Sequence, residues 1–371
     1  MSENNSFSVV IATKGRVDLL ADLLTSLKTA REGYPGKTEV LLIDDSASAD
    51  AEKIQAISLF HHANYRYFSG NVAAKRNYGA NEAKHEILLF LDSDCLVKPS
   101  LFQAYNAAYK KNSVCAVAGP LQFVGEDTWF WKAIAATPFV IGFYLPNWLE
   151  KLEWGVTANF TVRRWLFEKI SGFDEALFQK AGEDVDLGLR IRKAGFEIHS
   201  CQQASISHSK KTWTPPKDMI RRVWNYGAAD YWLISKHPEK AVMIPPRRTL
   251  IYGFWLLLGI AITLITSNPF MLWIYPVIIL LENSLLSLWI NATVPRKKAS
   301  FFQQLTAQLL IHVNEAGYLM ECLKKRDFIK MNKQMVYYQG QYKGMLEIHA
   351  AIFRIVLLLT TAMGIIGIFY V

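Results

Sequence analysis

Two carboxylates one residue apart follow an apolar run in the stretch LLFLDSDCLV, residues 88–97. Asp92 and Asp94 flank Ser93 at the end of that run. Carboxylates this close repel each other, and a divalent cation beside them relieves the repulsion. Oxygen ligands on a loop suit Mg²⁺ or Mn²⁺, which commonly also bind substrate phosphates. A polar strand end, with an Asp capping the helix that starts near Pro99, explains the same residues, and the pair taken alone favours this simpler interpretation.

Two further polar clusters could contact a nucleotide. Asp44 and Asp45 end another apolar run and could bind a base or ribose, although an Asx-type turn uses the same residues. Lys75 and Arg76 open a helical pattern, where cations could contact a nucleotide or diphosphate. A solvated helix start is the alternative for that pair.

A third cluster lies in the segment AGEDVDLGLRIRKAG, residues 181–195. Glu183, Asp184 and Asp186 fall in the first turn of an amphipathic helical pattern. The helix dipole favours acids at this position, so the three carboxylates have a structural explanation. One of them could also act as a general base near a substrate hydroxyl.

Short apolar runs alternate with amphipathic segments over the first 245 residues. The runs are residues 7–13, 39–45, 65–70 and 86–94, and the amphipathic segments that follow them are residues 17–30, 51–60, 73–84 and 99–111. This alternation predicts an α/β fold with a mainly parallel sheet covered on both faces. Ligands of such sheets bind beyond the carboxyl ends of the strands, where this chain gathers its polar residues. Neither a GxGxxG loop nor a Walker A loop follows the first run, which disfavours dinucleotide and P-loop sites.

Six motifs in order resemble those of the family 2 glycosyltransferases, which are inverting enzymes with the Rossmann-like GT-A fold. They are VVIATKGR (9–16), LLIDDSAS (41–48), GNVAAKRNYGA (70–80), DSD (92–94), GVTANFTVRRWLFEKISGFDE (155–175) and GED (182–184). The resemblance covers about residues 7–230. It implies transfer of a sugar from a nucleotide-sugar to an acceptor hydroxyl in one displacement, with Mg²⁺ or Mn²⁺ as cofactor.

The resemblance also implies roles for individual residues. The residues expected to line the donor pocket are Thr13, Asp44, Asp45, Arg76 and Asp92. Asp94, with Asp92 near it, is expected to bind the metal. Asp184 is expected to be the catalytic base beside Glu183, and Asn159 and Arg163 to lie near the sugar or acceptor.

The chain also departs from the family's processive members. It lacks their QxxRW motif after residue 184 and has Arg221 and Trp224 instead, which could contact a phosphate and stack on a sugar, or could snorkel onto lipid. His208 stands where related enzymes often have a histidine, so it is a candidate third metal ligand. A structural role for this histidine is favoured slightly.

The composition changes after Pro245-Pro246. Three long apolar stretches, about residues 249–266, 270–290 and 350–371, are each long enough, or nearly so, to span a bilayer. Basic residues at 247–248 and 296–298 flank the first two, which places both ends of that hairpin in the cytosol. We therefore expect a cytosolic catalytic domain, residues 1–245, followed by a membrane domain, residues 246–371.

Two polar features of the second part need an explanation. The segment 301–323 is amphipathic and has basic clusters at both ends, which predicts a helix at the cytosolic interface, with a fourth span as the alternative. Glu282 interrupts the second apolar stretch and is expected to pair with Arg354 or to face a polar groove.

Composition bounds the remaining possibilities. Apolar residues make up 51% of the chain and the net charge is +9. The basic residues cluster at membrane boundaries, which favours anionic lipid over nucleic acid as partner. The four cysteines are far apart and predict reduced thiols, and no secretory signal is expected at the N-terminus.

The sequence thus predicts a multi-pass plasma-membrane glycosyltransferase. Its expected donor is a nucleotide-sugar, with UDP favoured, and its expected acceptor is a lipid-linked molecule or a glycan. A processive polysaccharide synthase and a non-catalytic membrane scaffold remain alternatives.

Overall fold

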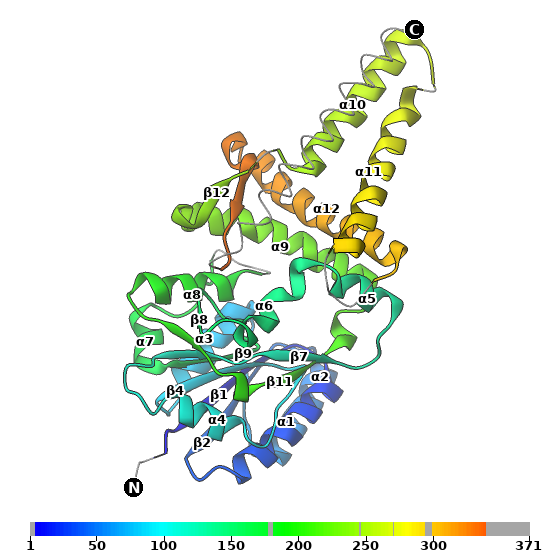
Figure 1. Cartoon of the computed structure of the whole chain (residues 1–371). Helices are drawn as coiled ribbons and strands as arrows, with labels where there is room; N and C mark the ends of the chain where they lie inside the picture. Colours follow the sequence, from blue (N-terminus) through cyan, green and yellow to red (C-terminus); the bar gives the residue numbers. More distant parts are fainter. Residues whose placement is uncertain (1–3, 177–180, 245, 270, 294–298, 339–371) are drawn as a thin grey trace. The chain divides into compact units, whose positions relative to one another are not determined.

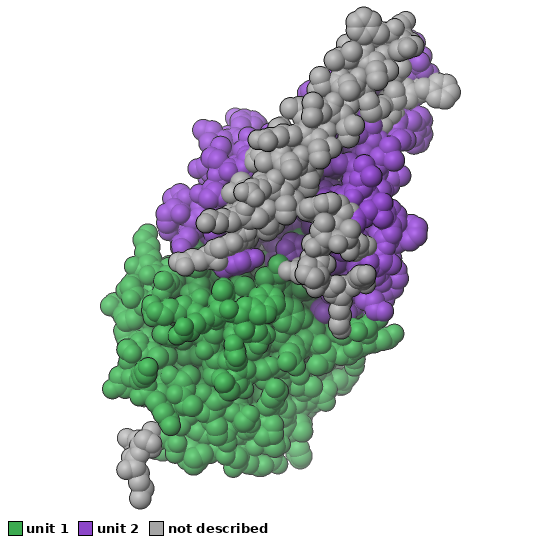
Figure 2. Space-filling view, in the orientation of Figure 1, with its two compact units in different colours: residues 1–127, 139–219 green, residues 128–138, 220–371 purple. Residues whose placement is uncertain are grey.

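A computed structural model describes residues 4–176, 181–244, 246–269, 271–293 and 299–338. The chain forms two compact units, coloured separately in Figure 2. The first unit comprises Met1–Asp127 and Phe139–Met219, and the second comprises Thr128–Pro138 and Ile220–Val371. The composition of the sequence changes at residue 245, whereas packing divides the chain at residue 219, within a helix.

An eight-stranded sheet organises the first unit. Its strand order is β3-β2-β1-β4-β9-β6-β10-β8. The bounds are β1 Phe7–Thr13, β2 Thr38–Asp44, β3 Asn64–Tyr67, β4 Ile87–Asp92, β6 Ala116–Ala118, β8 Lys151–Leu152, β9 Asn159–Arg163 and β10 Ile198–Ser200. Strands β3, β2, β1 and β4 are parallel to one another, and β9 is antiparallel to β4. The predicted α/β fold with a mainly parallel sheet is confirmed.

Helices lie on both faces of this sheet (Figure 1). They are α1 Val17–Glu32, α2 Ser48–Phe60, α3 Val72–Glu82, α4 Leu101–Ala108, α6 Ile141–Tyr144, α7 Arg164–Lys169 and α8 Glu183–Lys193. Strands β1 and β4 are buried along almost their whole length, which explains why they read as continuous apolar runs in the sequence.

The register of the parallel strands aligns their carboxyl ends. Thr13 of β1 lies opposite Asp44 of β2, and Ala12 lies opposite Asp92 of β4. A second sheet, of order β5-β11-β7, continues from this edge, with β5 Cys95–Leu96, β7 Leu121–Val124 and β11 Ile206–Ser209. Strand β11 pairs with β5 so that His208 lies opposite Cys95. The two sheets together bring distant segments to one edge.

The second unit is mainly helical. It contains α5 Trp129–Ala135, most of α9 Pro216–Lys236, α10 Arg248–Thr266, α11 Met271–Thr293 and α12 Phe301–Lys324, with a small sheet of β12 Ala241–Met243 and β13 Lys333–Met335. Helices α10, α11 and α12 occupy the first two predicted apolar stretches and the predicted amphipathic segment. In the described part of the chain, one helix, over residues 248–265 of α10, is long and apolar enough to cross a membrane. The third predicted stretch, residues 350–371, lies outside the described residues.

The polar residue in the second apolar stretch has a partner in the same unit. Glu282 of α11 accepts a hydrogen bond from the Tyr252 hydroxyl of α10, and the neighbouring Asn283 accepts one from His312 Nε2 of α12, 3.1 Å away. Hydrogen bonds to a neighbouring helix are how apolar helices retain such groups. The expected partner Arg354 lies outside the described residues.

We predict that Gly79→Val lowers the stability of the first unit. A Cβ atom at Gly79 of α3 would lie 2.5 Å from Val10 Cγ1 and 3.1 Å from Ile43 Cγ1, so a side chain there forces α3 away from the sheet. The expected loss in free energy of unfolding is about 1–3 kcal/mol. Thermal unfolding measures it. Gly33→Ala is the matched control, because the nearest atom to its new Cβ is 3.6 Å away, and an equal loss there would contradict the packing argument.

Candidate active site

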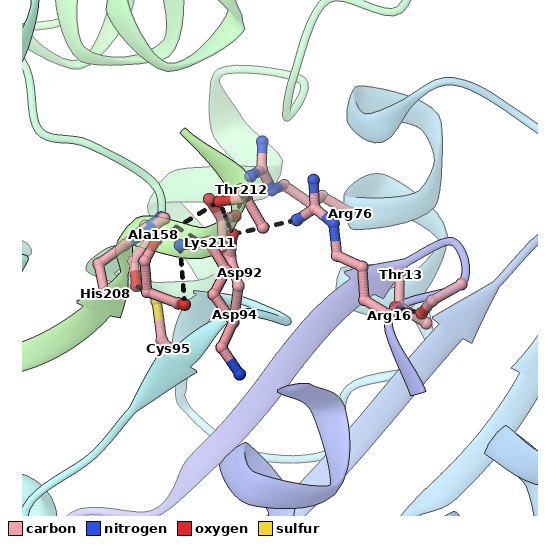
Figure 3. A network of polar contacts seen from close by, with 12 residues as sticks. Thr13, Arg16, Arg76, Asp92, Asp94, Cys95, Ala158, His208, Lys211 and Thr212 are labelled. Carbon is pink, nitrogen blue, oxygen red and sulfur yellow. Dashed lines mark hydrogen bonds and ion pairs between the residues drawn. The ribbon is translucent and has the colours of Figure 1, made fainter. Parts of the chain in front are cut away.

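Asp94 lies at the centre of a group of side chains from four segments (Figure 3). It follows β4 in the turn that leads to β5 and is 4% exposed. Its Oδ1 lies 3.4 Å from His208 Nε2. Its Oδ2 accepts hydrogen bonds from Thr212 Oγ1 at 2.7 Å and from Arg16 Nη1 at 3.2 Å. The structure therefore brings the predicted metal ligands Asp94 and His208 together, although 114 residues of sequence separate them.

The chemistry of this group fits a divalent cation. One ligand atom each from Asp94, Cys95 and His208 lie within 4.8 Å of one another. His208 Nδ1 lies 3.2 Å from the Ser209 carbonyl oxygen, and donation to that oxygen leaves the Nε2 lone pair facing Asp94. A metal-binding histidine is commonly oriented in this way. Burial raises the pKa of the Cys95 thiol, so it stays protonated and a carboxylate and an imidazole remain as ligands.

Arg76 links Asp92 to the start of helix α8. This residue is 3% exposed, and its guanidinium donates from Nη2 to Asp92 Oδ1 at 2.8 Å and from Nη1 to Glu183 Oε1 at 2.7 Å. The two carboxylates compensate the buried positive charge. Arg76 was expected to line the donor pocket. In this structure it connects β4, α3 and α8.

Asp184 follows Glu183 in the first turn of α8. Gly182 precedes this turn with a positive φ of 91°, which turns the chain into the helix. Removal from water and the negative charge of Glu183 together raise the pKa of Asp184 to about 7, although the positive charge of Arg76 lowers it. A carboxylate with a pKa near neutrality is suited to general-base catalysis.

The predicted donor residues lie at the ends of β1 and β2. Asp44 is fully buried and accepts hydrogen bonds from Ser46 and from the Tyr65 hydroxyl, the latter at 3.1 Å. Asp45 accepts from Lys75 Nζ at 2.6 Å, and the same Nζ donates to the Thr13 carbonyl at 2.7 Å. Lys75 thus ties the two strand ends together.

The two residues predicted on the acceptor side lie at opposite ends of β9. Asn159 pairs with Leu91, near the carboxyl end of β4, but it is fully buried and its amide is held by Tyr105 and by the Ala204 carbonyl. Arg163 pairs with Ile87, at the other end of β4. An antiparallel strand of this length carries its two ends about 13 Å apart. The structure therefore does not bring Arg163 to the site, and it gives Asn159 a structural role.

Arg163 has partners of its own at that far edge. Its guanidinium donates to Glu86 and to the Val114 carbonyl, the latter at 3.0 Å, and lies over the Tyr109 ring. The other two residues predicted on the acceptor side, Arg221 and Trp224, belong to α9 of the second unit. Both remain predictions for the acceptor side.

The sequence motifs did not single out Arg16 and Thr212, and they indicated Lys75 only as a cation that could contact a nucleotide. Arg16 and Thr212 contact Asp94, and Lys75 holds Asp45. Arg16 ends the VVIATKGR motif and Lys75 precedes Arg76, so the motifs contained both. Thr212 carries no such signal, because only the pairing of β11 with β5 brings its segment to the site.

Comparisons with known proteins decide the family. Residues 8–173, which carry β1, β2, β4 and Asp94, match the family model "Glycosyl transferase family 2". The matched segment, which makes up somewhat less than half of the chain, is a family 2 glycosyltransferase segment. The relatives include the O-antigen biosynthesis protein RfbC of Myxococcus xanthus, 29% identical over 61% of this chain and 18% of that protein. A pre-mycofactocin glycosyltransferase of Mycobacterium tuberculosis (strain CDC 1551 / Oshkosh) is 25% identical over 63% of this chain and 48% of that protein.

A solved structure of a known protein shares the fold of this chain. The mannosyltransferase PcManGT from Pyrobaculum calidifontis, in complex with GDP-Man and Mn²⁺, has a TM-score of 0.50 and 14% identity over 88% of each chain. Escherichia coli chondroitin synthase is a further sequence relative, 21% identical over 56% of this chain and 35% of that protein. The chain spans less than half the length of the curated relatives named here.

We predict that Asp184→Asn stabilises the metal-free protein at alkaline pH. The pKa of about 7 lies above the ordinary aspartate value, so the carboxyl favours folding while protonated and loses that contribution as the pH rises through about 7. The variant should therefore gain about 1–3 kcal/mol at pH 8.5 and nothing below about pH 4. Thermal unfolding with a chelator measures this. Asp18→Asn, an exposed aspartate in the first turn of α1, is the control, and an equal gain there would contradict the prediction.

Proposed function

We propose that this protein is a membrane-bound inverting glycosyltransferase that moves a sugar from a nucleotide-sugar, with UDP favoured, to a lipid-linked or glycan acceptor. The observation that carries the proposal is the meeting, at one edge of the sheet, of a metal-ligand pair and a raised-pKa carboxylate. Asp94 and His208 form the pair, and Asp184 is the carboxylate. Arg76 joins the two parts through Asp92 and Glu183.

The residues divide the reaction between them. Asp184 accepts the proton of the acceptor hydroxyl while that oxygen attacks the anomeric carbon from the face opposite the nucleotide, which inverts the configuration in one displacement. Arg76 holds the neighbouring carboxylates in place and leaves Asp184 as the group with a pKa near neutrality. Mg²⁺ or Mn²⁺, held by Asp94 and His208, would supply positive charge against the charge that develops on the leaving diphosphate.

The names of relatives and neighbours support the substrate classes. The fold neighbour was solved with GDP-Man and Mn²⁺, and two sequence relatives are named for O-antigen biosynthesis and chondroitin synthesis. These names favour a nucleotide-sugar donor, a divalent metal and cell-surface polysaccharide as the pathway product. We retain UDP as the first donor to test and GDP as the second.

Helices of the second unit support the membrane location. Residues 248–265 of α10 are long and apolar enough to cross a bilayer. Helix α12 leaves large apolar side chains on its outer face, since Phe302 and Leu309 are 67% and 57% exposed while Gln304 and Gln308 are buried. An apolar outer face with lysines at its end suits the interface of an anionic membrane. We place the catalytic unit in the cytosol at the plasma membrane.

A donor scan with the full-length protein tests the activity. UDP- and GDP-sugars are incubated with membrane extracts as acceptor, with Mn²⁺ or with a chelator, and sugar transfer is measured. We predict metal-dependent transfer from one donor, and a loss of about 10²–10⁴-fold in kcat for Asp184→Asn with nucleotide binding retained. Full activity of this variant would remove Asp184 as the base, and transfer unchanged by the chelator would remove the metal.

A labelling experiment tests the topology. The four native cysteines are buried, so a new cysteine is the main target of a membrane-impermeant maleimide. We predict that Asn268→Cys, between α10 and α11, is labelled in intact cells. Lys28→Cys, at an exposed position of α1 in the catalytic unit, should be labelled only after permeabilisation. The reverse pattern would contradict both the hairpin and the cytosolic catalytic unit.

A further inference from the structure

Arg16 has a backbone conformation that non-glycine residues rarely adopt. It precedes the first turn of α1 with φ 60° and ψ 39°, in the left-handed region, and Gly15 before it also has a positive φ of 63°. Two hydrogen bonds hold this loop, because Gly15 N donates to Ser46 Oγ at 2.6 Å and Leu20 N donates to the Arg16 carbonyl at 3.0 Å. Unfavourable conformations of this kind persist mainly at functional sites.

The conformation directs the Arg16 side chain to the metal-ligand pair (Figure 3). Arg16 Nη1 lies 3.2 Å from Asp94 Oδ2, whereas His208 faces Oδ1. The guanidinium thus compensates the buried charge of the carboxylate that we assign to the metal. The Asp94 side chain is 3% exposed and the Arg16 side chain 42% exposed, so the cation of this pair has room to move and the anion does not.

Arg16 and Arg76 differ in exposure and in the number of their ion pairs. Each arginine pairs with one carboxylate at the end of β4, but the Arg76 side chain is 4% exposed and also pairs with Glu183 of α8. Arg16 makes one ion pair and reaches it from a loop. Arg76 is therefore the more firmly held of the two arginines, and Arg16 is the more exposed one.

We propose that Arg16 substitutes for the divalent cation at Asp94 while the donor is absent, and that it binds the donor's diphosphate once the cation arrives. This inference rests on the proposed function. A cation at Asp94 repels the guanidinium, and a nucleoside diphosphate offers it new acceptors. Arginine is suited to this exchange, since its fork of N–H donors matches phosphate as well as carboxylate. Arg16 is then a donor-binding residue that also weakens metal binding to the empty site.

The direction of the effect separates this proposal from a purely structural role. If Arg16 only braced Asp94, its removal would loosen the carboxylate and weaken metal binding. If Arg16 competes with the metal, its removal strengthens metal binding and weakens nucleotide binding. Opposite signs for two ligands of one site are not expected from a folding defect.

The experiment measures both ligands with the full-length protein. Mn²⁺ binding is followed by electron paramagnetic resonance of the free ion, and UDP and GDP binding by calorimetry at saturating Mn²⁺. For Arg16→Gln we expect Mn²⁺ binding about two- to fivefold tighter without nucleotide, and diphosphate binding about tenfold weaker. Binding of uridine or guanosine, which lack the diphosphate, should not change. Arg16→Lys, which keeps the charge, should stay close to the wild type for Mn²⁺.

Two controls make the outcomes distinct. Lys14→Gln removes a charge from the same loop, but Lys14 is 71% exposed and pairs with Asp45, so Mn²⁺ affinity should stay unchanged. Arg16→Gly relieves the left-handed backbone and should reproduce the Mn²⁺ result in a stably folded protein. Unchanged or weaker Mn²⁺ binding in Arg16→Gln overturns the inference, while metal-dependent nucleotide binding by the wild type leaves the proposed function standing. A wild type that binds neither Mn²⁺ nor nucleotide overturns both.

Discussion

The buried guanidinium of Arg76 is the interaction on which the arrangement of the candidate site depends. It lies between Asp92 at the end of β4 and Glu183 at the start of α8, at 2.8 and 2.7 Å. An ion pair removed from water adds little net stability, but loss of one partner leaves a buried charge at a cost of about 3–5 kcal/mol. The triad therefore acts as a strict constraint on how α8 meets the sheet. The positive charge of Arg76 lowers the pKa of Asp184, but removal from water and the charge of Glu183 outweigh this effect.

The same arrangement gives Asp184 a pKa suited to a general base and lowers the stability of the folded state. Asp184 keeps a pKa of about 7 because it is removed from water beside Glu183, and above that pH its charge disfavours the folded state. The lost stability is offset elsewhere in the first unit, where β1 and β4 are buried and α3 packs closely on β1 and β2 through Gly79. A rigid apolar sheet thus supports a set of charges that would not assemble in water.

The strands and the type of site could be predicted because both follow from short-range patterns. Buried parallel strands are continuous apolar runs, and their polar ends must meet at one edge, which placed Thr13, Asp44 and Asp92 together. The errors and omissions concern long-range pairing. The antiparallel register of β9 takes Arg163 to the far edge, and the pairing of β11 with β5 brings Thr212 to Asp94. No local pattern encodes either register.

A motif match also predicts the kind of role that a residue has, but it does not predict which group the residue contacts. Arg76 and Arg16 both belong to motifs shared with family 2 glycosyltransferases, and either could be expected to meet a nucleotide. Burial distinguishes them, since a side chain 4% exposed between two carboxylates cannot leave them without a large cost, whereas one 42% exposed on a single carboxylate can. The function proposed above requires a site that binds a metal and a diphosphate and then releases the diphosphate, and both kinds of cation serve that cycle. The fixed arginine preserves the geometry between turnovers, and the exchangeable one follows the charge that enters and leaves.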